Sequence, residues 1–336
     1  MYELGHLGLY KNVPKKRIFN RTPDYANDAY TLLQYKSHLR NEFLIPLKAN
    51  GDGSGVATIR LQSLETQSVK ITGNGKFYTD SSGTTEAGIE STIGTTLGSL
   101  YVKVPEGESC YLVCGMADKL SGLGSISTNV IADGANIPYI NYCAINYPLI
   151  NLLVIRLNGV FNSSFTGSID NTPNLTRLNF TYNLLSAFTG SINNTPKLIQ
   201  LLFTTNLLSE ITGSTDNTPD LVALTLANNL RSSFTGDIGK IVNCNLLNSQ
   251  TNTNCAFTYV TRRNSWPSVY DTLWVSCTSM TSTMVDNLLI DLDASGTIPA
   301  GGKSINLNGL CGAVTSASET ARTSLVNKGF IVTVNT

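Results

Sequence analysis

Few side chains in this sequence are placed to do acid–base chemistry. Asp291 and Asp293 are two nearby carboxylates, a pairing that glycoside hydrolases use as general acid and general base. They stand near the end of an expected helix, however, where solvated polar residues are common. The two histidines, His6 and His38, are far from this pair in the sequence. We therefore expect no catalytic residue and favour a non-enzymatic protein.

Motifs for nucleophilic catalysis and for phosphate or metal binding are also missing. The sequence has no GxSxG, HExxH or P-loop pattern, and the stretch from Gly51 to Gly55 lacks the lysine of a phosphate loop. The seven cysteines are an odd number at scattered positions, with no CxxC pair to suggest zinc or a disulfide framework. Cys110 and Cys114 would lie on one strand face as small buried apolar residues. We expect neither a metal nor a cofactor.

The composition argues against nucleic-acid binding and against membrane insertion. Charged residues make up 14% of the 336 residues and the formal net charge is zero, far from the basic balance of a phosphate-binding protein. No window approaches the roughly 18 apolar residues that a membrane-spanning helix needs. Few charges with abundant Asn, Ser and Thr favour a protein that contacts partners or copies of itself.

The middle of the chain repeats every 23 residues. The sequence FTGSIDNTP starts at Phe165, returns at Phe188 as FTGSINNTP and at Ile211 as ITGSTDNTP, and ends in the shortened FTGDI at Phe234. A fixed period of this length predicts one supersecondary unit stacked on copies of itself. Stacked units present an extended surface rather than a catalytic cleft, so the repeat favours a binding or scaffolding role.

Each repeat unit also carries the pattern Leu-x-x-Leu-x-apolar-x-x-Asn. Its central leucines are Leu178, Leu201 and Leu224, and its closing asparagines are Asn183, Asn206 and Asn229. Apolar residues two apart predict a short strand with one buried face. The asparagine is expected to end the strand and to hydrogen-bond backbone groups of neighbouring units.

The pattern and its period resemble those of leucine-rich-repeat proteins, which implies a solenoid. The FTGSI segment is similar to the LTGxIP element of the plant-type subclass, which implies a second short strand on the flank of each unit. Imperfect copies on both sides of the three clean ones are expected to belong to the same solenoid, because terminal units must cap its open ends.

Around the repeats, the sequence predicts a mainly β protein in four parts. They are an N-terminal arm over 1–43, a small β-sandwich-like domain over 44–120, a leucine-rich-repeat solenoid over 121–265, and a degenerate repeat with an α/β C-terminal cap over 266–336. The β-domain is predicted from runs at Val56–Leu61, Val69–Thr72, Leu100–Val104 and Cys110–Val113.

The cap is predicted from two helical patterns and a last strand. Apolar residues recur at helical spacing from Met284, with a threonine cluster before them for the N-cap. A second helix is expected over 316–328, with Gly329 as its stop, followed by a strand from Phe330.

If the repeats bind a partner, leucine-rich repeats usually do so on the concave strand face, through the positions between the buried residues. The candidate contacts are Arg177, Asn179, Thr181, Gln200, Leu202 and Thr204. They include one charge and no aromatic residue, whereas recognition surfaces tend to carry Tyr, Trp and Arg. The face is therefore compatible with a receptor-binding surface and equally with a soluble spacer.

The β-domain, the FTGSI repeats and the C-terminal LVNKGFIVTV together resemble leucine-rich virion proteins of bacteriophages that infect Bacteroidetes-type bacteria, and surface repeat proteins of those hosts. The resemblance implies a spike, fibre or capsid or tail decoration protein in the virion. Its partners would be other virion proteins or copies of itself, bound through the mildly basic arm, and a glycan or protein of the host surface. The start of the sequence lacks the apolar stretch of a signal peptide, which favours the virion over the alternative, a secreted or cell-surface bacterial adhesin.

Overall fold

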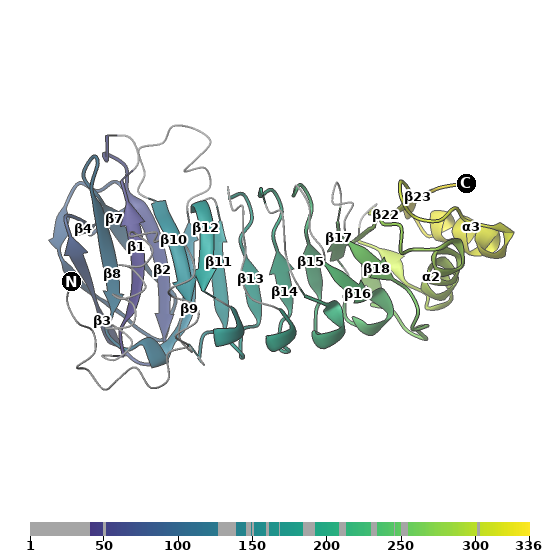
Figure 1. The fold of residues 1–336 in the computed structure, drawn as a ribbon, viewed down its shortest axis with the longest axis horizontal. Coiled ribbons are helices and arrows are strands. Elements are labelled where there is room, and N and C mark those ends of the chain that lie inside the picture. Colours follow the sequence, from purple (N-terminus) through teal and green to yellow (C-terminus); the bar gives the residue numbers. More distant parts are fainter. Residues whose placement is uncertain are drawn as a thin grey trace, which may run out of the picture.

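The described part of the chain is elongated and mainly β, and its largest elements are a 13-stranded and a 6-stranded sheet (Figure 1). A computed structural model describes residues 41–49, 52–126, 139–145, 149, 151–158, 161–167, 169–183, 192–207, 213–229, 234–244, 246–249, 255–300 and 303–336. The N-terminal arm predicted over 1–43 lies outside the described residues up to position 40.

The N-terminal part contributes to both sheets around a shared core. Its elements are β1 Phe43–Lys48, β2 Ala57–Ser63, β3 Gln67–Gly73, β4 Lys76–Tyr78, β5 Glu86–Gly88, β6 Glu90–Ile93, β7 Gly98–Lys103, β8 Ser109–Cys114, η3 Ala117–Lys119, β9 Leu120–Ile126 and β10 Tyr139–Ile145. The four strands predicted from the sequence are confirmed as β2, β3, β7 and β8. Leu61 of β2 and Leu112 of β8 come from different sheets and are buried in one continuous core.

Strand β9 joins the N-terminal sheets to the repeats. It pairs antiparallel with β2, which places Leu123 opposite Leu61. It also pairs in parallel with β11 (Val154–Asn158), which places Leu123 opposite Ile155. All three side chains are buried. The boundary that the sequence predicts between 120 and 121 therefore lies at a strand shared by both parts, and main-chain hydrogen bonds continue across it.

The strands of the repeat units pair in parallel and in register. After β11 they are β13 Arg177–Asn179, β14 Gln200–Leu202, β15 Ala223–Thr225, β17 Leu246–Asn248, β20 Thr272–Trp274, β22 Ser304–Leu307 and β23 Ile331–Val334. Leu178, Leu201 and Leu224 lie opposite one another, as the 23-residue period predicts. All three are fully buried, so the predicted inward face of these strands is confirmed.

The rest of each repeat unit carries short helices and strands. These are η4 Ile169–Asn171, η5 Ile192–Asn194, η6 Thr215–Asn217, η7 Ile238–Lys240, β12 Phe161–Gly167, β16 Thr235–Asp237, β18 Ala256–Thr258, β19 Val269–Tyr270 and β21 Ile298–Pro299. Gly213 and Gly236 have φ angles of 144° and 158°. A Cβ on them would lie 2.6 Å from Ile192 and 1.9 Å from Thr215 of the preceding unit, so glycine is what lets the units approach.

The fourth copy of the repeat motif has Asp237 where the other copies have serine. Its buried carboxylate accepts hydrogen bonds from the backbone N–H groups of Gly239, Val260 and Thr261, at 3.0, 3.2 and 2.8 Å. Val260 and Thr261 follow β18, the strand of the next unit. The substitution of aspartate for serine thus supplies a carboxylate that ties one unit to the next.

An asparagine closes the bend after each strand. Asn206 donates from Nδ2 to the carbonyl oxygens of Phe180 and Phe203, at 2.8 and 3.0 Å. Asn229 donates in the same way to Phe203 and Leu226, at 2.8 and 2.9 Å. Both asparagines are buried, and each bonds its own unit and the preceding one. The expected role of these side chains is therefore confirmed.

The residue before each asparagine adopts a left-handed backbone conformation. The φ angles of Tyr182, Thr205 and Asn228 are 58°, 58° and 57°. This conformation turns the chain so that the asparagine points inward, and Asn183 of the first unit donates to the Phe180 carbonyl at 2.8 Å. Asparagine tolerates this region, whereas a β-branched threonine is strained in it.

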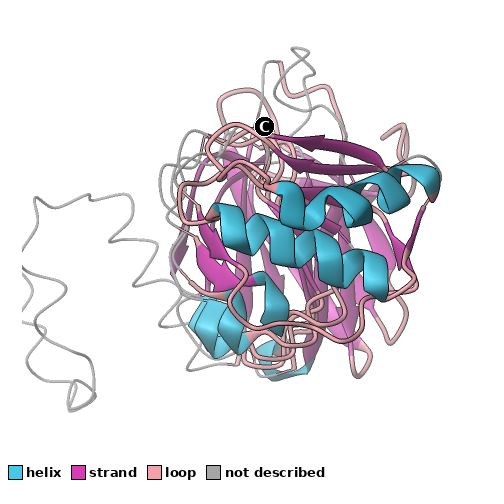
Figure 2. Ribbon diagram, turned by 90° about the vertical axis from the view of Figure 1, so that its right-hand side faces the viewer, coloured by secondary structure: helices cyan, strands magenta, loops and turns pink. Residues whose placement is uncertain are grey.

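The C-terminal part carries α-helices in place of the short helices. Helix α2 spans Ser282–Ala294, and η8 (Ser316–Ser318) leads into α3, Glu319–Asn327, which packs beside α2 (Figure 2). Thr281 caps α2 by accepting a hydrogen bond from the N–H of Met284 at 3.4 Å. Both predicted helices and the last strand, β23, are confirmed. None of the helices among the described residues combines the length and the apolarity needed to span a membrane.

Asp286 connects the two helices. Its carboxylate accepts hydrogen bonds from the Thr315 N–H at 3.0 Å, from the Thr315 hydroxyl at 2.6 Å and from the Ser318 hydroxyl. Burial acts to raise the pKa of Asp286, but the hydrogen bonds from Ser318 and Thr315 outweigh it, so the pKa lies below its usual value of 3.8. The ionised carboxylate therefore fixes the start of α3 against α2.

We predict that Leu201→Ala lowers the free energy of unfolding by about 2–5 kcal/mol, because it leaves a cavity in the stacked leucines. The matched control is Leu207→Ala in the same unit, whose side chain is 44% exposed and which should change stability by less than about 0.5 kcal/mol. Urea denaturation measures both. Equal losses in the two variants would contradict the register described above.

We predict that Thr205→Asn and Thr205→Gly each stabilise the protein, by up to about 1 kcal/mol, because both residues tolerate the left-handed region. Thr205→Ala is the comparison, since it keeps a Cβ and lacks the local hydrogen bonding of asparagine. Thermal unfolding should rank Asn and Gly above Ala. A lower melting temperature for both Asn and Gly would show that the left-handed backbone at this position carries no strain.

We predict that Asp286→Asn costs about 1.5–3 kcal/mol at neutral pH, because it removes a charged acceptor of buried hydrogen bonds. Since the folded-state pKa is lowered, this contribution is present above the unfolded-state pKa and is lost as the pH falls through the folded-state pKa. The stability difference between wild type and variant should therefore shrink below about pH 4. The exposed Asp220, changed to Asn in the same way, is the control.

Candidate interaction surface

The outward side chains of the repeat strands form a regular surface, which we call the ladder face. Its residues are Arg177, Asn179 and Thr181 from the first unit, Gln200, Leu202 and Thr204 from the second, and Ala223, Thr225 and Ala227 from the third. Parallel pairing sets Arg177 beside Gln200 and Asn179 beside Leu202. Because side chains two apart on a strand point the same way, the predicted contacts of each row lie next to one another.

Exposure decreases from the first unit to the third in two of the three rows of the ladder face, those that end at Ala223 and Ala227. Arg177 is exposed, Gln200 is half-buried, and Ala223 is only 7% exposed. Ala227, at the end of the third row, is 3% exposed. The most open part of the face is therefore the end nearest the N-terminal sheets, where the guanidinium of Arg177 stands.

Hydrogen bonds within the face occupy several of its polar groups. The side-chain oxygen Oδ1 of Asn179 accepts from the Thr181 N–H at 2.9 Å and from the Thr181 hydroxyl at 2.6 Å. The hydroxyls of Thr204 and Thr225 lie 2.7 Å apart and bond each other. A ligand would therefore meet Arg177, Gln200 and Leu202 more readily than these three threonines.

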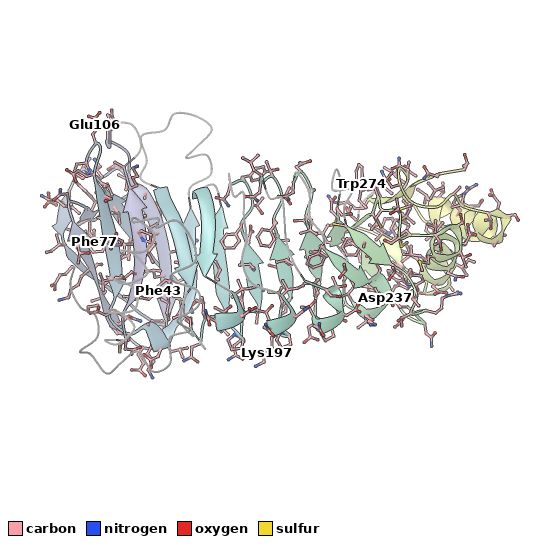
Figure 3. The ribbon with its side chains drawn as sticks, in the orientation of Figure 1. Phe43, Phe77, Glu106, Lys197, Asp237 and Trp274 are labelled. Carbon is pink, nitrogen blue, oxygen red and sulfur yellow. The ribbon has the colours of Figure 1, made fainter. Side chains whose placement is uncertain are left out.

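The ladder face continues beyond the clean repeats and includes an aromatic residue, Trp274. Its strand β20 pairs with β17 on one side and β22 on the other, so Trp274 lies between Asn248 and Asn306 (Figure 3). Trp274 is half-buried, whereas Asn306 is only 8% exposed. Indole rings flanked by amides suit both protein and sugar ligands.

The sequence did not single out Trp274 because the spacing of the strands changes there. The paired residues Leu224 and Leu247 are 23 positions apart (247 − 224), but Leu247 and Leu273 are 26 apart (273 − 247). Because of this change of spacing, the 23-residue period does not align Trp274 with the outward positions of the earlier units. The hydrophobic pattern around Leu273 still predicts the strand itself.

The paired carboxylates singled out in the sequence lie in the last turn of α2, as expected, but their side chains are only 11% and 22% exposed. Asp291 accepts hydrogen bonds from the Arg262 Nε at 2.6 Å and from the Tyr259 hydroxyl at 2.7 Å. Asp293 binds the Lys328 Nζ at 2.6 Å. The expectation of solvated positions is wrong, because the repeat packing brings a cation to each carboxylate. Each aspartate therefore joins α2 to a different neighbouring segment.

Cysteines 110 and 114 have the predicted structural role. Both are buried and unbonded, and burial raises the pKa of each thiol to about 12, so neither is a thiolate at neutral pH. Among the residues that the structure describes, no group of His, Cys, Asp and Glu is arranged to hold a metal ion.

Comparison with known proteins adds no relative: no protein-family model matches the chain, and no curated protein shows significant similarity to it.

Proposed function

We propose that this chain is a non-enzymatic leucine-rich-repeat protein that works through its surface. The parallel, in-register strands from β11 to β23 carry this proposal, because they set one outward row of side chains along much of the molecule. The buried asparagines, which bond their own unit and the preceding one, are those expected of a leucine-rich-repeat solenoid. Such repeats are extended scaffolds for binding.

We place the protein in a bacteriophage virion, as a spike, fibre or decoration protein of the capsid or tail. The support is the resemblance of its repeats and its C-terminal segment to leucine-rich virion proteins, together with a low charge content of 14%. Its N-terminal arm would attach it to other virion proteins or to copies of itself. The alternative is a secreted or cell-surface bacterial adhesin, which would use the same face.

Mass spectrometry and electron microscopy of purified particles distinguish these two locations. A virion protein is recovered with the particle in a fixed ratio to the capsid protein, and an antibody against the chain decorates one structure of that particle. Recovery from the bacterial surface, with none in purified particles, would favour the adhesin.

On the ladder face, we propose contact with a glycan or protein of the host surface. Arg177, Gln200 and Leu202 form its open end, and Trp274 supplies an aromatic side chain, which the ladder positions of the first three units lack. Arg and Trp are the residues that most often dominate binding energy at interfaces. A row of small neutral residues without such anchors would instead be a spacer between other parts of the particle.

We predict that Arg177→Ala combined with Gln200→Ala weakens binding of the labelled protein to host cells roughly thirtyfold or more, since one hot spot contributes about 2 kcal/mol. Trp274→Ala should have a comparable effect. The control is Lys197→Ala, an exposed residue away from the ladder face (Figure 3). Undiminished binding in all the variants, or no binding by the wild type, would make the repeat region a spacer.

A further inference from the structure

Two edges of the described sheets, β5 and β6, are protected against pairing with another chain. At one end of the 13-stranded sheet, β5 has three residues, an irregular register with β4, and an ion pair from Glu86 to Lys76 at 2.8 Å. At an edge of the 6-stranded sheet, β6 carries Glu90, which pairs with Lys70 at 3.0 Å. Short strands, bulges and charges of this kind keep edges from associating.

The other end of the 13-stranded sheet, β23, carries neither a charge nor an irregular register. Its sequence, Ile-Val-Thr-Val, has no charge and no proline, and all four residues pair in register with β22. Ile331 is 60% exposed, although it is the largest side chain of the strand. An uncharged, regular edge strand with an exposed isoleucine is a template on which another strand can pair.

The backbone of β23 offers hydrogen-bonding groups on its outer side. The Ile331 N–H donates to the Lys303 carbonyl at 3.1 Å, so the groups of Ile331 and Thr333 point toward β22. In a parallel pair the intervening residues point away from the partner, so the N–H and C=O of Val332 and Val334 face outward. Asn335 holds the end of the strand in place, because its side chain donates to the carbonyls of Gly309 and Cys311.

The helix beside this edge is also free of unpaired charge. The exposed residues of α3 include Thr320, Thr323, Val326 and Asn327. Its charged residues Arg322 and Glu319 pair with each other, and Lys328, directly after the helix, pairs with Asp293, each at 2.6 Å. Figure 2 views this end of the molecule, where the helices lie side by side near the last strands. Helix and strand thus present one neutral end surface.

We propose that β23 pairs with β23 of a second copy, so that two chains join end to end in one continuous sheet. The occupant must be an extended, uncharged strand with free backbone groups, and β23 itself has these properties. The protected edge at β5 disfavours head-to-tail addition, which leaves a closed two-fold pair. Because the formal net charge is zero, long-range electrostatic repulsion does not oppose the approach of the two copies.

One register satisfies all the outward groups. If Val332 lies opposite Val334 of the second copy, the two symmetric pairs exchange four main-chain hydrogen bonds, because each such antiparallel pair forms two. Thr333 then lies opposite Thr333 of the second copy, a cross-strand pairing that stabilises sheets. The same two-fold axis brings the neutral faces of the two α3 helices toward each other.

Sedimentation analysis of the full chain tests the pairing, and Thr333 is the residue to change because it is exposed in the single chain. The wild type should have twice the chain mass of 36.1 kDa. Thr333→Asp and Thr333→Lys should each raise the dissociation constant more than about tenfold, since like charges then oppose each other. An equal mixture of the two variants should restore the dimer.

The matched control is Thr92, an exposed threonine on the protected edge strand β6, changed to Asp or Lys. These variants should keep the mass of the wild type. A monomeric wild type at its highest soluble concentration, or a dimer that Thr333→Asp and Thr333→Lys leave intact, overturns the proposal. The dimer does not depend on the proposed host contact, since the ladder-face variants should associate normally while losing binding.

Discussion

Each repeat unit must turn its chain after a short strand without leaving backbone carbonyls unpaired in the interior, and this constraint governs the fold. Buried asparagines meet it, because Nδ2 of Asn206 and Asn229 reaches carbonyl groups of two successive units. The residue before each asparagine has a left-handed backbone, which directs the asparagine side chain inward. This backbone conformation costs conformational free energy. The register of the strands, and with it the alignment of the outward side chains, follows from these bends.

A stack of such units has two open ends, and the chain closes them differently. At one end, β9 belongs to the repeat sheet and to the N-terminal sheets at once, so the first unit meets a preformed hydrophobic core. At the other end, α2 and α3 replace the short helices and are held together by the carboxylate of Asp286. The final strand is left with an unprotected backbone.

The structure could be predicted from the sequence wherever one residue type determines the local geometry. Leu178, Leu201 and Leu224 share a 23-residue period, so their pairing could be predicted. Trp274 could not be placed on the ladder face, because the spacing between paired residues changes before it. Strand β1 was not predicted, and its first residue, Phe43, fell in the predicted arm. Its segment contains Pro46 and is buried almost throughout, so it has no alternating pattern. The ion pairs of Asp291 and Asp293 depend on contacts distant in sequence, which periodicity does not report.

The parallel pairing of identical units also makes the length of the molecule adjustable in whole steps. Each of the central units is bonded to the one before it and the one after it. Duplication or loss of one 23-residue segment would therefore move the two ends apart or together by one strand spacing, about 4.8 Å, without changing the structure of either end. Recombination between the near-identical FTGSI segments could generate such variants, and the chain would then act as a ruler whose reach is set by the number of its repeats.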